Sequence, residues 1–414
     1  MLAGLLADSH LTPFELLPAR ITAHARAAGL GDVRIYLGDL QRRVLRLLTG
    51  GGPGADHDDE PPEPELTVEG SVAGRAYQYG HIVPLNSGEG GSRPCWVPLL
   101  NGTERLGVMR VTSQDDDERA REDMLALAGL VAMLVVGGRD TSDHHARLTR
   151  SSPMNVAAEM QWQLMPPRTY ADGRVVIGAV MEPAYQVSGD AFDYGTADDL
   201  VHLSLFDAMG HDTAAGLTAN LAMGACRNHR RQGTRLADLG DAIEGVLLRQ
   251  FGPSRYVTGV LADLDTSNGV LTWVNRGHHP PLVIRDGRWA IQLHCPPAHP
   301  MGTDLGLPIR VGREHLQPGD RIVLYTDGIT EARTPGGQEF GLTRFTDFLI
   351  RHHADELPVP ETLRRLIRAV LDHHDGDLQD DATILLCEWL GPRRDTAAAA
   401  PRAGVELPLG HPGG

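Results

Sequence analysis

The stretch Leu200-Val-His-Leu-Ser-Leu-Phe-Asp-Ala-Met-Gly-His-Asp212 determines the fold that we predict for the second half of this 414-residue sequence. Its apolar run predicts a buried strand that ends in Asp207, just before a helical pattern that starts at Ala214. Gly210 allows a tight turn between the two. A carboxylate fixed at a strand end can bind a hard cation together with other carboxylates, but an isolated Asp would equally well cap the helix.

Three further acidic motifs follow the same pattern. Val187-Ser-Gly-Asp-Ala-Phe-Asp193 precedes the strand, Leu324-Tyr-Thr-Asp-Gly-Ile-Thr-Glu331 follows a second apolar strand, and Gln379-Asp-Asp-Ala-Thr-Ile-Leu-Leu386 opens a third. Dispersed aspartates without a matching His or Cys set predict an oxygen-only site for Mg²⁺ or Mn²⁺ rather than zinc. Such a site suits hydrolysis of a phosphate ester, because two divalent ions can share a water and neutralise the phosphoryl oxygens.

In this order the motifs resemble the stage II sporulation protein E type phosphatases, a bacterial branch of the metal-dependent serine/threonine phosphatases of the PP2C class. The resemblance covers roughly Ala158 to Trp389, and it includes Met160-Gln-Trp-Gln-Leu-Met-Pro-Pro167, Asn275-Arg-Gly-His-His-Pro-Pro281 and Leu316-Gln-Pro-Gly-Asp320. It implies an α+β fold, an αββα sandwich in which two antiparallel sheets are flanked by helices.

The resemblance also implies the catalytic and metal-binding residues, which are Asp190, Asp207, Ala208, Asp327 and Asp380. By this resemblance Asp207 bridges two ions, Mn²⁺ or Mg²⁺, and the carbonyl of Ala208 binds one of them. Asp327 and Asp380 hold the other ion, and Asp190 binds directly or through water. Asp380 is preferred to its neighbour, Asp381, because the second position varies in the family's pattern.

Other residues of these motifs have supporting roles by the same resemblance. Gly189, Asp193 and Gly328 shape the site, and Asn275 with His278 braces a hairpin. For His211 the resemblance leaves two roles open, a structural hydrogen bond or the orientation of water or phosphate.

The sequence departs from the family pattern in two places. Ser188-Gly-Asp190 replaces Gly-Gly-Asp, and Asp207-Ala-Met-Gly-His-Asp212 replaces Asp-x-Ser-Gly-His-Gly. The additional carboxylate of Asp212 is expected either to perturb the metals or to point to solvent. No basic residue that would bind phosphate beside the metals can be assigned.

Composition excludes several classes of function. The sequence has 38 Lys and Arg against 54 Asp and Glu, a net charge of -16, which argues against a nucleic-acid partner. No lysine is present, so Schiff-base chemistry and a P-loop lysine are excluded. The four cysteines, Cys95, Cys226, Cys295 and Cys387, are far apart and indicate neither a disulfide framework nor a thiolate zinc site.

The beginning of the sequence and its hydropathy predict a cytoplasmic protein with no membrane partner. Met1-Leu-Ala-Gly-Leu-Leu-Ala-Asp8 has no basic leader, and no apolar run approaches the ~18 residues of a spanning helix.

Residues 1–138 look like a GAF domain, a module that senses small molecules or other signals. The pattern is a helix over Pro13–Gly29, strands over Val33–Leu37 and Val44–Leu48, a hairpin with further strands, and a helix over Glu122–Val136. The stretch Gly50–Glu65 predicts a flexible loop, because it is acidic and rich in proline and glycine. A GAF-like domain that binds nothing and only dimerises is an open alternative, and we expect a homodimer.

Residues 139–167 predict a helical linker that couples the sensor to the phosphatase. Ser152 is the expected helix cap and Pro153 the first-turn residue, and Ala157, Met160 and Leu164 form one apolar stripe. Residues 168–390 form the predicted phosphatase domain, and residues 391–414, rich in Ala, Pro and Gly, predict a disordered tail.

The phosphatase region alternates predicted strands and helices, and short turns such as Asp265-Thr-Ser-Asn-Gly269 favour antiparallel hairpins. The predicted strands are 175–181, 200–206, 256–264, 269–275, 282–284, 321–325 and 382–388, and the predicted helices are 214–231, 236–250, 342–352 and 360–374.

These features lead to the hypothesis of a Mn²⁺- or Mg²⁺-dependent serine/threonine protein phosphatase that is gated by its N-terminal sensor. By resemblance its substrate is a phosphorylated anti-sigma factor antagonist of the STAS type, which implies partner-switching control of transcription. The input at the GAF-like domain is a small molecule or a protein. Two alternatives remain open: a non-catalytic phosphoprotein-binding module and a hydrolase of small phosphate esters.

Overall fold

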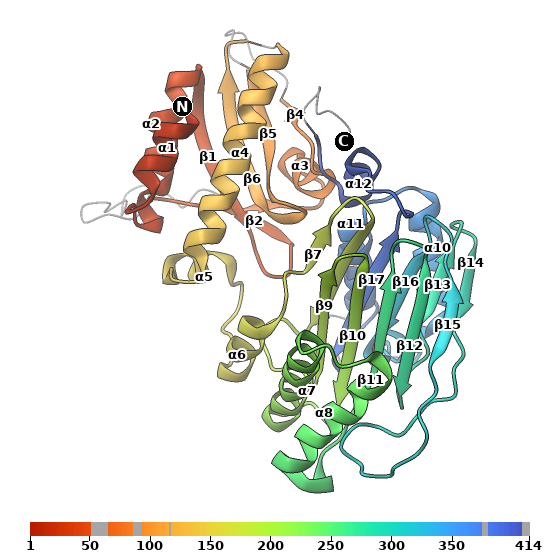
Figure 1. The fold of residues 1–414 in the computed structure, drawn as a ribbon. Helices are drawn as coiled ribbons and strands as arrows, with labels where there is room; N and C mark the ends of the chain where they lie inside the picture. Colours follow the sequence, from red (N-terminus) through yellow and green to blue (C-terminus); the bar gives the residue numbers. More distant parts are fainter. Residues whose placement is uncertain (51–64, 86–92, 116, 375–379, 408–414) are drawn as a thin grey trace. The chain divides into compact units, whose positions relative to one another are not determined.

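The computed structural model describes residues 1–50, 65–85, 93–115, 117–374 and 380–407, and the chain forms two compact units (Figure 1). The first unit comprises Met1–Pro153 and Gly404–Gly414, and the second comprises Met154–Ala403. The boundary between them falls inside the predicted linker. Most of the predicted flexible loop, residues 51–64, lies outside the described residues.

The first unit is built on a six-stranded antiparallel sheet in the order β3-β2-β1-β6-β5-β4. Its strands are β1 (Leu30–Gly38), β2 (Val44–Leu47), β3 (Leu66–Thr67), β4 (Val83–Pro84), β5 (Arg93–Asn101) and β6 (Glu104–Ser113). Its helices are α1 (Leu2–Ser9), η1 (Phe14–Leu16), α2 (Leu17–Ala25), η2 (Arg26–Ala28), α3 (Val72–Tyr79), α4 (Glu118–Arg139) and α5 (Asp143–Thr149). The helix predicted over Pro13–Gly29 is therefore divided into three short helical segments.

Alternation along the strands explains why helices cover both faces of this sheet. Successive side chains of a strand point to opposite faces. In β1, Ile35 and Leu37 join a core with residues of α1, α2 and α4, whereas Tyr36 joins a second core with Ala73 and Ala76 of α3. The resemblance of this unit to a GAF domain stays a prediction.

The second unit contains two antiparallel sheets, of strand order β15-β12-β11-β10-β9 and β14-β13-β16-β17-β8-β7. The first sheet comprises β9 (Asp190–Ala197), β10 (Leu200–Ala208), β11 (Val257–Asp265), β12 (Val270–Arg276) and β15 (Gly312–His315). The second comprises β7 (Thr169–Ala171), β8 (Val175–Glu182), β13 (Leu282–Arg285), β14 (Trp289–Gln292), β16 (Arg321–Tyr325) and β17 (Ala382–Trp389).

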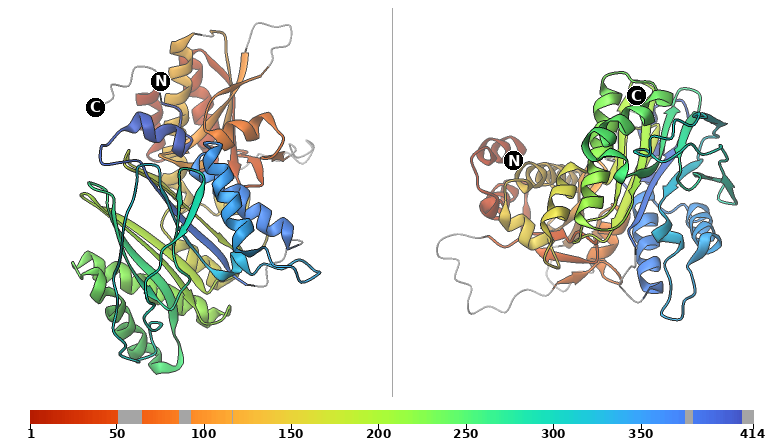
Figure 2. Two further views of the ribbon diagram at one scale, coloured as in Figure 1. Left: turned by 90° about the vertical axis from the view of Figure 1, so that its right-hand side faces the viewer. Right: turned by 90° about the horizontal axis from the view of Figure 1, so that it is seen from below.

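Helices cover the outer faces of this pair of sheets (Figures 1 and 2). The helices of the unit are α6 (Val156–Leu164), α7 (Thr213–Arg231), α8 (Leu236–Phe251), η3 (Gly252–Ser254), α9 (Asp327–Thr330), α10 (Gly341–Ala354), α11 (Val359–His373) and α12 (Thr396–Ala403). Phe206 and Ala208 of β10 pack with residues of α7 and α8. On the outer face of the second sheet, α11 packs against Gly178 of β8. A Cβ at Gly178 would lie only 2.9 Å from the side chains of Val359 and Leu363, so glycine allows this close packing.

The main core lies between the two sheets. Leu203 and Leu205 of β10 and Phe192 of β9 pack there with residues of β8, β16 and β17. The predicted pair of antiparallel sheets flanked by helices is thus observed. All seven predicted strands and four predicted helices of this region overlap observed elements.

Several local predictions need correction. The prediction omits β7, β9, β14 and β15; β9 was missed because the buried Asp190 and Asp193 interrupt its apolar pattern. The helix expected to start at Ser152-Pro153 is α6, which begins at Val156 and is capped by Asn155, whose side chain accepts from the Ala158 amide at 2.7 Å.

The tail predicted to be disordered is also partly ordered, because residues 396–403 form α12. Alanine has the highest intrinsic helix propensity. The Asp395 carboxylate accepts from the amides of Ala397 and Ala398 at 3.0 and 3.1 Å, and Ala399 and Ala403 are buried. Residues 408–414 lie outside the described residues.

Among the described residues no single helix is both long and apolar enough to span a bilayer, although α4 and α5, bent by 109° at their junction, pass that test as a pair.

Candidate metal centre

One end of the core between the sheets changes from apolar to acidic side chains. In β10, Leu203 and Leu205 face the opposite sheet, so the period of two places Asp207 on the same face. In β9 the same period places Asp190 on the face of Phe192. Because Asp207 pairs with Asp190 in the β9–β10 register, the two carboxylates are neighbours.

The second sheet supplies further polar residues to this end. In β16, Ile322 and Leu324 face the core, and the next inward position is Thr326, directly before Asp327 at the start of α9. β17 begins at Ala382, and the same parity places Asp381 on the inward face. Asp381 is buried, whereas Asp380, the predicted ligand, is exposed.

Burial and the charges of neighbouring carboxylates raise the pKa values of Asp207, Asp190 and Asp381. Burial and then the charges of Asp327 and Asp380 raise the pKa of Asp207 to about 7. Burial and the charges of Asp207 and Asp381 raise the pKa of Asp190 well above its ordinary value. Burial, opposed by the Gly189 amide and reinforced by the Asp380 charge, raises the pKa of Asp381 to about 6. The fold therefore concentrates negative charge at a buried place that disfavours it.

Hydroxyl and amide groups hold two of these carboxylates. The Thr326 hydroxyl donates to the Asp190 carboxylate at 2.8 Å and accepts from the Thr383 amide at 2.9 Å, which ties the two sheets together. The Gly189 amide donates to the Asp381 carboxylate at 2.5 Å. Thr326 is missing from the predicted site, although it lies within the quoted motif.

The Asp207 carboxylate has a longer hydrogen-bond contact than Asp190 and Asp381 have. The Thr258 hydroxyl lies 3.3 Å from its carboxylate but 2.9 Å from Nδ1 of His278. Burial lowers the pKa of His278 to about 4, so the ring is neutral. Its Nε2 lies 3.0 Å from the Tyr325 carbonyl and must donate to it, which leaves Nδ1 to accept the single Thr258 proton.

The backbone of His278 takes part in the hairpin turn that the sequence singles out. The His278 amide donates to the Asn275 side chain at 2.7 Å, and the Asn275 amide group donates to the His278 carbonyl at 2.8 Å. Asn275 and His278 thus brace this turn.

The donor set fits a hard divalent cation. Asp190, Asp207 and Asp381 form no ion pair with a basic side chain in the described ranges, although burial and mutual repulsion oppose their charge. No three His, Cys, Asp or Glu side chains there already enclose a metal position. The residues thus supply buried and half-buried oxygen ligands that have no ion-pair partner within the described ranges, and a cation would remove their repulsion.

Asp193 has another role than the acidic residues around it. It is buried, and Arg227 and Arg230 of α7 bind its two carboxylate oxygens at 2.7 and 3.0 Å. Its position in β9 places it on the face that is covered by α7. This buried ion pair attaches the helix to the sheet that carries Asp190 and Asp207.

Asp212 caps a helix, and this departure from the family pattern has a structural reason. Its carboxylate accepts from the Ala215 amide at 2.8 Å at the start of α7. The cap of the helix is therefore Asp212 and not Asp207, whose carboxylate stays on the inward face. His211 is exposed, and its charge lowers the pKa of Asp381.

Two other clusters of polar residues lie away from these aspartates. Cys226, His202 and Asp263 form a buried series with distances of 3.6 and 2.8 Å. Burial raises the pKa of the Cys226 thiol to about 12, so this cysteine is not an activated nucleophile.

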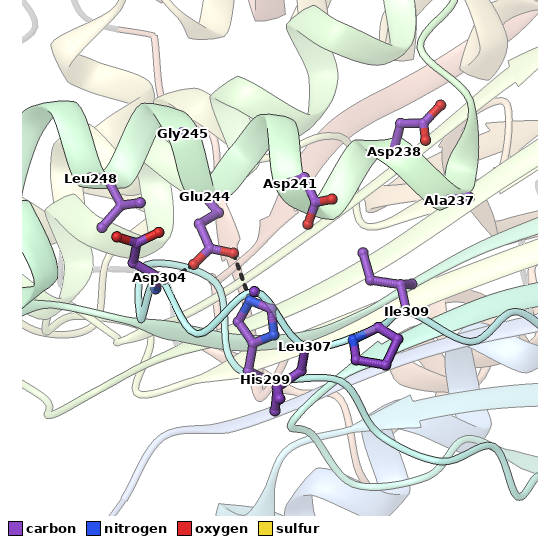
Figure 3. Close-up of a pocket in the computed structure, with 12 residues that line it drawn as sticks. Ala237, Asp238, Asp241, Glu244, Gly245, Leu248, His299, Asp304, Leu307 and Ile309 are labelled. Atoms are coloured by element: carbon purple, nitrogen blue, oxygen red, sulfur yellow. Dashed lines mark hydrogen bonds and ion pairs between the residues drawn. The ribbon is translucent and has the colours of Figure 1, made fainter.

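A cavity of about 590 Å³ lies between α8 and residues 299–309 (Figure 3). There Glu244 accepts from the Asp304 amide at 2.6 Å and lies 2.9 Å from Nε2 of His299, while the buried Arg276 binds the same carboxylate at 2.6 Å. None of the predicted metal ligands lines this cavity.

Comparison with known proteins finds a family match within the second unit. Residues 197–390 match the family model described as Stage II sporulation protein E (SpoIIE). The comparisons support a SpoIIE-type phosphatase domain in this part of the chain. The matched range contains Asp207, Asp327 and Asp380, whereas Asp190 lies before it.

Curated relatives and a solved structure extend the likeness beyond the SpoIIE-type match. The chain is 23% identical to phosphoserine phosphatase RsbU of Bacillus subtilis over 237 residues, which are 57% of this chain and 69% of that protein. It is 23% identical to protein IcfG of Synechocystis sp. over 263 residues, 56% of this chain but only 39% of IcfG. The SiaA-PP2C domain of Pseudomonas aeruginosa has the same fold, with a TM-score of 0.50, 22% identity and coverage of 56% of this chain and 94% of that domain.

In the second unit Gly328 allows two backbone segments to meet. A Cβ at this position would overlap the Asp381 carbonyl oxygen and lie 2.7 Å from its carbon. Gly189 has a similar role, because a Cβ there would lie 3.0 Å from the Ala208 carbonyl oxygen and 3.4 Å from the Asp381 carboxylate. Both glycines therefore shape the site.

Substitution of Gly328 by Ala should lower the free energy of unfolding by about 1–3 kcal/mol, because β17 must move away from α9. Gly224→Ala is the matched control: Gly224 lies in α7, is exposed and has no atom within 4 Å of an added Cβ, so that change should be neutral or stabilise by about 0.5–1 kcal/mol. Urea unfolding measures both, and equal stabilities would contradict the proposed close approach.

Replacement of Thr326 by Val keeps the side-chain volume but leaves the Thr383 amide and the Asp190 carboxylate without their partner. We expect a loss of about 1–3 kcal/mol in the free energy of unfolding. Thr326→Ser retains the hydroxyl and should lose less than half of that amount. If the Thr326→Val variant were as stable as the Thr326→Ser variant, the hydroxyl would not link the two sheets.

Proposed function

We propose that this chain is a Mn²⁺- or Mg²⁺-dependent serine/threonine protein phosphatase. The observation that supports the proposal best is the group of buried and half-buried, mutually repelling carboxylates at one end of the core between the sheets. The SpoIIE-type match and the relation to RsbU support phosphate ester hydrolysis as the proposed chemistry of this site. RsbU, one of the relatives, is named as a phosphoserine phosphatase.

The proposal assigns metal-binding roles to four aspartates and positioning roles to two threonines. Asp207 and Asp190 come from neighbouring strands of one sheet, whereas Asp327 follows β16 and Asp380 precedes β17 of the other sheet, so the proposed ligands come from both sheets' ends. Two divalent ions held there would neutralise the phosphoryl oxygens and lower the pKa of a water near them. The Thr326 hydroxyl fixes the Asp190 carboxylate, and Thr258 directs its proton to His278, which leaves the Asp207 oxygens available as ligands.

The proposed substrate is a phosphorylated anti-sigma factor antagonist of the STAS type. This class of substrate is implied by the resemblance of the sequence motifs to the SpoIIE-type phosphatases. The name of RsbU as a phosphoserine phosphatase supports a phosphoserine ester as the group removed. The first unit, which resembles a GAF domain, is the proposed sensor, and α6 at the start of the second unit is the proposed coupling helix. The first unit also provides the proposed surface for a homodimer.

The metal-dependent reaction is tested with the full chain, an aryl phosphate, and Mn²⁺, Mg²⁺ or a chelator. We expect turnover only with metal and a loss of at least about 100-fold in Asp207→Asn and in Asp327→Asn, because each removes a ligand charge. Asp372→Asn is the control, since Asp372 on α11 is 72% exposed and is not among the predicted ligands. Metal-independent turnover, or full activity in Asp207→Asn, would contradict the proposal.

Thermal unfolding gives an independent readout of the same site. Metal should raise the unfolding temperature of the wild type, because a ligand that binds only the folded state stabilises it. Asp207→Asn should be more stable than the wild type without metal, because it removes one of several repelling buried charges, and it should gain less from metal. The opposite order without metal would show that repulsion among the carboxylates is not significant.

Substrate class is tested by comparing a phosphorylated STAS-domain protein with a phosphoserine peptide and the aryl phosphate. A kcat/KM at least about 100-fold higher for the folded phosphoprotein would support a protein substrate. Equal values for all three would favour a hydrolase of small phosphate esters.

A further inference from the structure

The end of the described chain returns to the first unit. Residues up to Ala403 belong to the second unit, whereas the segment that starts at Gly404 belongs to the first. The chain therefore passes between the units twice, once near Pro153 and once at Ala403–Gly404. The second passage occurs in the stretch that the sequence predicts as a disordered tail.

Residues 404–406 bind the first unit through both backbone and side chain. The Glu406 amide donates to the Gly80 carbonyl at 3.1 Å, and the Ile82 amide donates to the Glu406 carboxylate at 2.8 Å. Arg121 of α4 forms an ion pair with the other carboxylate oxygen, with Nε at 3.0 Å. Arg105 of β6 donates to the Gly404 carbonyl at 3.4 Å. The Glu406 side chain is only 18% exposed as a result.

Gly80 provides the space for this segment. It ends α3 with φ of +69°, and a Cβ at this position would overlap the Gly404 carbonyl oxygen. Gly102, in the turn between β5 and β6, has a similar φ of +58° but no atom within 4 Å of such a Cβ. The two glycines thus both have a positive φ, and of the two only Gly80 lies against the returning chain.

On the other side of Ala403 the chain is fixed to the second unit by α12. Ala399, Ala400 and Ala403 are buried, and Arg402 lies 3.5 Å from the carboxylate of Glu388. Ala403 is the last residue of α12 and Gly404 already contacts the first unit, so no residues separate the two attachments.

Glu388 connects α12 to the strands that carry predicted metal ligands. It is fully buried, pairs in register with Arg321 and binds its guanidinium at 2.8 Å. Arg321 begins β16, whose other end leads to Asp327, and Glu388 lies near the end of β17, which starts directly after Asp381. Through Arg402 and Glu388, α12 is thus joined to the β16–β17 pair at the end opposite to the aspartates.

We propose that residues 404–406 form a strap, docked in a site of the first unit made by Gly80, Ile82, Arg105 and Arg121, through which that unit controls the phosphatase. The occupant of this site is the chain's own Gly404–Glu406 segment. The docking of the strap is inferred from the contacts of Gly404 and Glu406. Its control of phosphatase turnover rests on the proposed function.

Hydrogen exchange of the full-length chain tests the docking. The Glu406 and Ile82 amides should be protected in the wild type, and Gly80→Ala should reduce their protection at least about 10-fold. Gly102→Ala should leave it unchanged. Glu406→Gln, which keeps the size of the side chain but removes its charge, should reduce the protection of the Ile82 amide. Equal protection in Gly80→Ala and Gly102→Ala, or none in the wild type, would overturn the docking.

Turnover of the aryl phosphate tests the control. Gly80→Ala and Glu406→Gln should both change kcat at least about threefold in the same direction, while Gly102→Ala should match the wild type. Loss of docking with unchanged kcat would overturn the control. A wild type without turnover but with protected Glu406 and Ile82 amides would contradict the proposed phosphatase function and leave the docked strap established.

Discussion

The packing of two antiparallel sheets is the constraint on which the second unit depends. Each strand presents alternate side chains to the partner sheet, so the apolar residues of β10, β16 and β17 that form the core also fix which residues face inward at the strand ends. At one end these inward positions are acidic or hydroxyl-bearing, as at Asp207, Thr326 and Asp381. The candidate metal centre is therefore a continuation of the core and not a separate loop structure.

This arrangement opposes the stability of the metal-free protein. Burial of apolar residues between the sheets stabilises the fold, but it brings carboxylates together where water is excluded, and their pKa values rise as a consequence. Hydrogen bonds from Thr326 and from the Gly189 amide offset part of this cost. A divalent cation would offset the rest, so metal binding and stability of the folded state are expected to be linked.

Glycines and ion pairs connect the strands of the candidate metal centre to the surrounding helices. Gly328 permits the close approach of α9 to the backbone of Asp381, and Asp193 attaches α7 to β9 through two arginines. At the opposite end of β16 and β17, Arg321 and Glu388 form the buried pair to which α12 is joined. The strands that carry the site are therefore held by contacts with helices that are distant in the sequence.

The sequence by itself determined most of the strands and helices in the second unit and the short motifs that carry its acidic residues, because apolar periodicity and short motifs are local properties. It did not determine that Asp212 caps α7, that Asp381 is buried while Asp380 is exposed, or that Thr326 joins the sheets. These depend on register and on contacts between distant segments. The order of residues 396–407 was missed for the same reason: composition predicts disorder, whereas burial of α12 and the partners of Glu406 exist only in the folded chain.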